Sequence, residues 1–122
     1  MAGYTQAYAQ TTLDANHPVA GNGDHVGYSA NGSTEFAGLA RTPIGATGYA
    51  AATAAQPSVK ANNAILTSAA ATSGGTVTHF AHFSAITAGV QKTDWTLLSA
   101  SKVVAVNDQL QWVVGALQIT MD

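Results

Sequence analysis

The sequence contains no cysteine among its 122 residues. This absence excludes a disulfide framework, a thiolate nucleophile, and any zinc or iron–sulfur site held by cysteine. Charge is also scarce, since Asp, Glu, Lys and Arg make up 8% of the chain, whereas ordinary soluble domains have about 25%. The four basic residues are scattered and cannot form the patch that neutralises phosphates, so we exclude nucleic acid as a partner.

Long apolar runs are missing as well. No run approaches the roughly 18 residues of a membrane-spanning helix, so we expect no membrane partner. Met1 is followed by Ala-Gly-Tyr-Thr-Gln, which lacks the basic and apolar parts of a signal peptide. A hydrophobic content of 47% predicts a folded chain, and its nearly uncharged surface predicts association with neighbouring subunits.

Short strand patterns separated by turns predict an all-β fold. The sequence predicts a strand at 24–30, an Asn31-Gly32 hairpin turn, and a partner strand at 35–44 that Pro43 places at an edge or strand end. The segment 49–55 is either a weak strand or coil. Further strands are predicted at 64–67, 76–84, 95–99, 103–106, 110–114 and 116–121. Such spacing is typical of an antiparallel β-sandwich, either jelly-roll or immunoglobulin-like.

The first 22 residues lie outside this strand pattern. Their apolar positions, which include Tyr4, Tyr8 and Leu13, match a helical period loosely. A turn-rich stretch follows at 16–23. We therefore predict a short helix or extended arm at 1–22 and a β-sandwich domain at 23–122.

The histidine pair in the second half does not predict a metal site. His79 and His82 lie three residues apart on a predicted strand, so their side chains point to opposite faces. Ser29 follows Gly27 in a near match to a nucleophile elbow, but the last glycine of that motif and the following helix are missing. We expect no catalytic residue and no cofactor.

The acidic residues near the N-terminus also have an ordinary structural interpretation. Asp14 and Asp24, close to His17 and His25, suggest a calcium or other metal loop, but Val19 occupies the position where an EF-hand loop needs glycine. Asx turns within loop-like sequence are the favoured alternative. We predict no metal site.

Several segments resemble a family of small virion structural proteins of tailed bacteriophages, common among actinobacterial phages. They are Gly74-Gly-Thr-Val-Thr-His-Phe-Ala-His-Phe-Ser84, Gly115-Ala-Leu-Gln-Ile-Thr-Met-Asp122, the stretches 95–101 and 103–110 between them, and Glu35-Phe-Ala-Gly-Leu-Ala-Arg41 upstream. The resemblance is carried chiefly by residues 64–122 and departs from the family pattern in the first third. Members of this family are described as head fibre, tail fibre, minor tail or decoration proteins.

The resemblance implies a non-enzymatic protein on the virion exterior, made in the cytoplasm of a bacterial host. We expect first a capsid decoration or minor capsid protein that associates with copies of itself, for example as a homotrimer, and attaches to the major capsid protein through Tyr4, Tyr8 and Leu13. The alternative is a tail-tip or tail-fibre subunit that contacts tail proteins and binds host-surface glycan. Tyr28 and Tyr49 are the aromatic residues expected to be exposed for such a contact.

Overall fold

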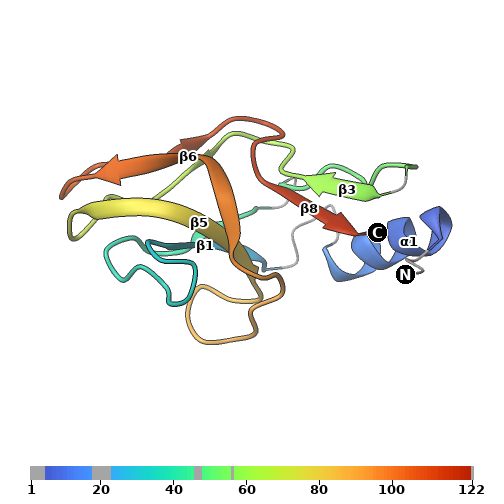
Figure 1. Ribbon diagram of the computed structural model, residues 1–122, viewed down its shortest axis with the longest axis horizontal. Helices are drawn as coiled ribbons and strands as arrows, with labels where there is room; N and C mark the ends of the chain where they lie inside the picture. Colours follow the sequence, from blue (N-terminus) through green and yellow to red (C-terminus); the bar gives the residue numbers. More distant parts are fainter. Residues whose placement is uncertain (1–4, 18–22, 46–47, 56, 122) are drawn as a thin grey trace. The chain divides into compact units, whose positions relative to one another are not determined.

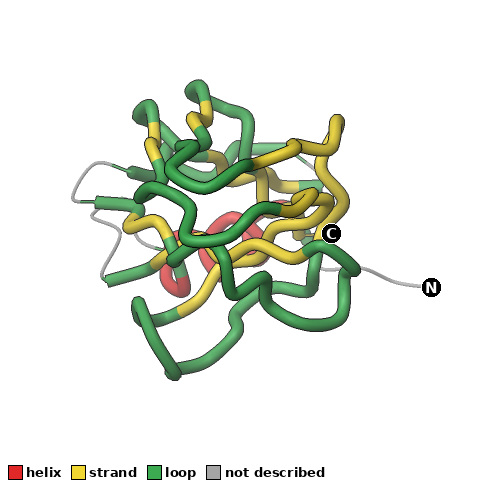
Figure 2. The backbone as a smooth tube through the Cα atoms, turned by 90° about the vertical axis from the view of Figure 1, so that its left-hand side faces the viewer, coloured by secondary structure: helices red, strands yellow, loops and turns green. Residues whose placement is uncertain are grey.

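The computed structural model describes residues 5–17, 23–45, 48–55 and 57–121 (Figure 1). The fold of this described part is mostly strands in antiparallel sheets, with one short N-terminal helix, which confirms the predicted class. Figure 2 shows that long loops connect the strands. The chain divides into two compact units: residues 1–22, 44–66 and 112–122 form unit 1, and residues 23–43 and 67–111 form unit 2.

Unit 1 contains helix α1 (Gln6–Asn16) and a two-stranded sheet. The Thr5 side chain caps the helix by accepting a hydrogen bond from the Tyr8 backbone N–H. Ala9 and Leu13 form the buried stripe of α1, which packs against strands β3 (Ser58–Ala61) and β8 (Gln118–Met121). The N-terminal segment therefore supplies part of the core of unit 1.

The buried side chain of Asn62, the residue that follows β3, holds two segments of unit 1 together. Its side-chain nitrogen donates to the backbone carbonyls of Ala64 and Val113, and its oxygen accepts from the Leu117 N–H. One side chain thus satisfies three backbone groups and joins the chain after β3 to the chain before β8.

Unit 2 contains a four-stranded sheet in the order β2-β1-β5-β6. Its strands are β1 (His25–Ser29), β2 (Thr42–Pro43), β5 (Gly75–Phe83) and β6 (Thr96–Val104). Strands β1 and β5 pair along the full length of β1, from His25 opposite Phe83 to Ser29 opposite His79. Consecutive residues of both strands, such as Tyr28 and Ser29 of β1 and Ala81 and His82 of β5, are buried, so both faces of this part of the sheet are covered. Two further short strands of the chain, β4 (Leu66–Thr67) and β7 (Gln111–Trp112), which are not assigned to unit 2 as a whole, form a separate two-stranded sheet.

The predicted hairpin after β1 is corrected by the structure. Only Thr42 and Pro43 of the expected strand at 35–44 pair with β1, and they form an edge strand, as Pro43 indicated. The Asn31 side-chain oxygen accepts from the backbone N–H groups of Ser33 and Thr34, and the Ser29 hydroxyl donates to the Thr34 carbonyl. These bonds hold a wide turn, so residues 35–41 form a loop instead of a strand.

Two other strand predictions also change. The expected strands at 95–99 and 103–106 belong to one continuous strand, β6. Strand β3 was not predicted from the sequence. Its inward residues are Ser58 and Lys60, both fully buried, whereas the usual pattern of a half-buried strand has apolar residues inward and polar residues outward.

Candidate functional site

Asp14 fastens helix α1 to the rest of unit 1. Its Oδ1 atom accepts a hydrogen bond from Lys60 Nζ at 2.7 Å and another from the Ala52 backbone N–H at 2.9 Å. The Lys60 side chain on β3 is 0% exposed, whereas the Asp14 side chain is 41% exposed. A buried ammonium is therefore neutralised by a carboxylate at the surface, and this contact connects α1, β3 and the loop at 49–55.

The same contacts change the acidity of Asp14. Burial by itself would raise the pKa of this carboxyl, but the hydrogen bonds from Lys60 and Ala52 and the positive charge of Lys60 outweigh it. The pKa of Asp14 therefore lies below its ordinary value of 3.8. The ionised form is the one that holds the helix.

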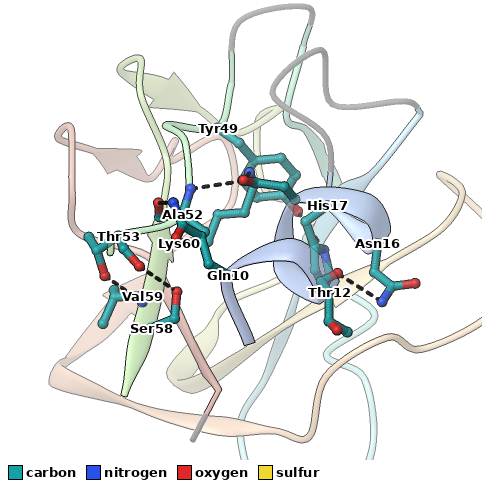
Figure 3. A network of polar contacts seen from close by, with 11 residues as sticks. Gln10, Thr12, Asn16, His17, Tyr49, Ala52, Thr53, Ser58, Val59 and Lys60 are labelled. Carbon is teal, nitrogen blue, oxygen red and sulfur yellow. Dashed lines mark hydrogen bonds and ion pairs between the residues drawn. The ribbon is translucent and has the colours of Figure 1, made fainter. Parts of the chain in front are cut away.

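Tyr49 and His17 complete the surroundings of Lys60. The Lys60 Nζ atom lies 5.7 Å from the centroid of the Tyr49 ring, and the Tyr49 hydroxyl lies 3.4 Å from His17 Nδ1. Figure 3 shows Lys60, Tyr49 and His17 gathered beside the helix. These contacts have a structural role, because they join residues of α1, β3 and the loop at 49–55 within unit 1.

The predicted attachment residues have different positions in the structure. Tyr4 lies outside the described residues. Tyr8 is 57% exposed on α1 and can reach a neighbouring protein, whereas Leu13 is buried in the core of unit 1. Leu13 cannot contact a neighbour while α1 keeps its packing, because its position on the helix turns it toward β3 and β8.

The expected exposure of Tyr28 and Tyr49 is wrong. Both side chains are 0% exposed. The Tyr28 hydroxyl forms a buried hydrogen bond with the Thr42 hydroxyl between β1 and β2, and Tyr49 packs edge-on against His17. A tyrosine can be buried when its hydroxyl finds a partner, so neither ring offers a surface for glycan.

The acidic residues considered for a metal loop pair with lysines. Asp24, which is buried, accepts a hydrogen bond from Lys92 Nζ at 2.6 Å in unit 2, much as Asp14 accepts from Lys60 in unit 1. His25 Nδ1 donates to the Gly23 carbonyl at 2.7 Å. In the part of the chain that the structure describes, no three His, Asp or Glu side chains gather as metal ligands.

Strand β6 presents the longest exposed edge of unit 2. It pairs with β5 on one side and ends the sheet on the other, as far as the described residues extend. Leu97 and Val103, near its two ends, are 69% and 79% exposed, and Lys102 is the one charged residue of the strand. We call this strand edge with its exposed side chains the β6 surface.

The middle of β6 departs from regular pairing. Leu97 lies opposite His79 and Lys102 opposite Val77, so residues 98–101 of β6 lie beside the single residue Thr78 of β5. This bulge bends the strand, as Figure 1 shows. The two ends of β6 remain paired to β5 and carry the exposed aliphatic side chains.

A second surface feature is a groove between two loops of unit 2. The groove has a volume of about 500 Å³ and is lined by residues of the segments 35–41 and 86–88. We call it the Arg41 groove, because Arg41 joins its two sides. The Arg41 Nε and Nη2 atoms donate to the two carboxylate oxygens of Glu35 at 2.8 and 2.9 Å, and Nη1 donates to the carbonyls of Ala85 and Ala88.

Sequence reasoning missed both surfaces. The β6 surface could have been found from the aliphatic residues and single charge of 96–104, had the two predicted strands been joined. The Arg41 groove had no sequence signal, since its two sides lie more than forty positions apart in the chain.

Comparison with known protein families gives one match that spans nearly the whole chain. Residues 7–120 match the family model described as "Podophage GP4 fiber I protein gp80". No curated protein matches the sequence. Within the described residues, no helix is long and apolar enough to cross a membrane.

Proposed function

Because the chain belongs to the podophage GP4 fiber I protein gp80 family, and so is a phage virion structural protein, we propose that it is a non-enzymatic subunit of a fibre on the particle exterior. The observation that carries this proposal beyond the family is the β6 surface. In our proposal, copies of the chain associate through this surface to build the fibre.

The chemistry of the β6 surface supports association with another copy. An edge strand offers unpaired backbone N–H and C=O groups, and monomeric proteins usually protect such edges with charges, prolines or a covering segment. Here nine residues carry a single charge and expose Leu97 and Val103 to solvent. Burial of these side chains against a second copy would remove apolar surface from water without separating an ion pair.

The bulge at residues 98–101 makes the contact selective. A bulged edge cannot extend a flat sheet indefinitely, since the backbone is bent where the next strand would pair. A closed oligomer satisfies such an edge better than an open-ended stack of sheets does. The bent edge of β6 thus supports a fibre of defined copy number.

The position of α1 favours a fibre subunit over a capsid decoration subunit. Decoration through an N-terminal arm requires a segment that can leave the domain and grip the shell. Residues 6–16 instead form a helix that Asp14 ties to Lys60 and that buries Leu13. The Tyr8 side chain is 57% exposed on α1, and in our proposal it contacts the capsid or tail protein at the base of the fibre.

Association through β6 can be tested with charged variants. We expect the wild-type chain to sediment as a homo-oligomer and Leu97→Lys or Val103→Lys to weaken association by at least about tenfold, because each places an ammonium in an apolar contact. Val113→Lys is the matched control, since Val113 is also an exposed valine, at 64%, but lies outside β6. A monomeric wild type, or equal weakening by the control, would contradict the proposal.

The location on the particle requires a separate measurement. Gold-labelled antibody against the chain should mark discrete projecting fibres on intact virions in electron micrographs. Label spread evenly over the head would assign the chain to capsid decoration instead, and absence of label from particles would overturn the virion location.

A further inference from the structure

We propose that the Arg41 groove is a binding site for a neutral saccharide. This inference goes beyond the fibre role, and neither depends on the other. It is based on which polar groups of the groove are already occupied, which remain accessible, and what surrounds them.

Arg41 is a structural part of the groove wall. Its side chain is 9% exposed, and its guanidinium lies 3.8 Å from the centroid of the Phe83 ring. Besides the two bonds to Glu35, its Nη1 atom donates to two backbone carbonyls of the loop that forms the opposite side. These contacts occupy most of the five N–H donors of a guanidinium, so Arg41 has little capacity left to bind an anion.

Glu35 is the polar group that remains accessible. Its side chain is 35% exposed, and each carboxylate oxygen accepts one N–H from Arg41. A carboxylate has about four acceptor positions, so capacity for further donors remains. The adjacent guanidinium cancels the negative charge, which leaves little attraction for a cation and favours a ligand with uncharged O–H or N–H donors.

The rest of the lining is mainly apolar. Phe36, Leu39 and Ile86 contribute aromatic and aliphatic surface, and the side chains of Ala37 and Ala40 are small. Small-molecule sites usually combine such a lining with a few fixed polar groups, and a volume of about 500 Å³ lies within their usual range. A neutral sugar matches this combination, because its ring has hydroxyl donors at the edge and apolar C–H groups on the face.

Amide NMR shifts of the full chain during titration with maltotriose or with N-acetylated chitotriose test the proposal. We expect saturable shifts, in the millimolar range for at least one of these neutral trisaccharides, confined to residues 35–41 and 85–89. Ala40→Leu should weaken binding by at least about tenfold, because it fills the groove from an exposed position. Ala69→Leu, an exposed alanine of unit 2 outside the groove, should bind as the wild type does.

Three results would overturn the inference. The first is no saturable shift with either trisaccharide, and the second is equal binding by the wild type and Ala40→Leu. The third is a change in sedimentation caused by Ala40→Leu and not by Ala69→Leu, which would identify the groove as a contact between copies. None of these results depends on where antibody labels the virion, so the fibre assignment and the saccharide site can fail separately.

Discussion

Replacing Asp14 with alanine should destabilise the protein more than replacing its partner Lys60 with methionine. Loss of the carboxylate leaves the Lys60 ammonium, 0% exposed, without its opposite charge. Removing one member of a buried ion pair costs about 3–5 kcal/mol. Because the Asp14 side chain is 41% exposed, water can reach part of the vacated position, so we expect a loss of about 2–3 kcal/mol in the free energy of unfolding.

The Lys60→Met variant should behave differently. Methionine retains an apolar chain beside Tyr49 and introduces no buried charge, and Asp14 keeps both its exposure and its bond from the Ala52 N–H. We expect a loss below about 1 kcal/mol. The double variant, Asp14→Ala with Lys60→Met, should be about as stable as Lys60→Met alone. Once the ammonium is absent, removal of the carboxylate no longer leaves a buried charge without its partner.

Urea unfolding at neutral pH, followed by tryptophan fluorescence, would measure these differences. Asp94→Ala is the control, since Asp94 is an exposed acidic residue, and its removal should change stability by less than about 0.5 kcal/mol. Two results would contradict this role of Asp14: a loss for Asp14→Ala no greater than that for Lys60→Met, or a double variant as unstable as Asp14→Ala.

The lowered pKa of Asp14 adds a dependence on pH. Between the folded and unfolded pKa values the unfolded state binds more protons than the folded state, so stability falls as pH falls. The contribution of Asp14 should be complete above its unfolded pKa of about 4 and should disappear as pH falls through the lower folded value. The stability difference between the wild type and Asp14→Ala should therefore shrink in acid, and a difference that stays constant would contradict this role.

Two further variants test local geometry. Arg41→Lys keeps the charge but loses the paired bonds to Glu35 and the fixed planar fork of the guanidinium. We expect a loss of about 1–3 kcal/mol in the free energy of unfolding and faster hydrogen exchange at the Val90 amide. Lys102→Arg on exposed β6 is the control and should leave that exchange unchanged. Gly32→Ala should cost about 1–2 kcal/mol, because Gly32 has a φ of +72° and a Cβ atom there would lie 2.8 Å from His79 Nε2. Gly45 has a similar φ of +81°, but no atom lies within 4 Å of the position of an added Cβ. We therefore expect Gly45→Ala to lower the free energy of unfolding, measured in urea, by less than Gly32→Ala does. Equal losses would show that the His79 contact does not matter.

Several elements could be predicted because local pattern and tertiary environment agree. The residue patterns at 24–30 and 76–84 predicted the two central strands of unit 2, β1 and β5. Both faces of these strands are covered in the structure, because neighbouring residues such as Tyr28 and Ser29 are buried together. The family match over 7–120 agrees with the resemblance at the level of a phage fibre-like structural protein. Strand β3 escaped prediction because Lys60 faces inward, and only the position of Asp14 on a distant helix makes that burial possible.

The sequence by itself determined the class of molecule. Without cysteine, with little charge and with short alternating segments, the chain had to form a thiol-free β-fold whose surface tends to associate. Those properties follow from composition and from neighbours along the chain. Tertiary structure decided which residues are accessible for contact. It buried Tyr28, Tyr49 and Leu13, left Leu97 and Val103 exposed, and brought together the two loops that form the Arg41 groove. The physical reason is that exposure and pairing depend on segments that are remote in sequence, and no local pattern contains the partner that buries a ring or neutralises a charge.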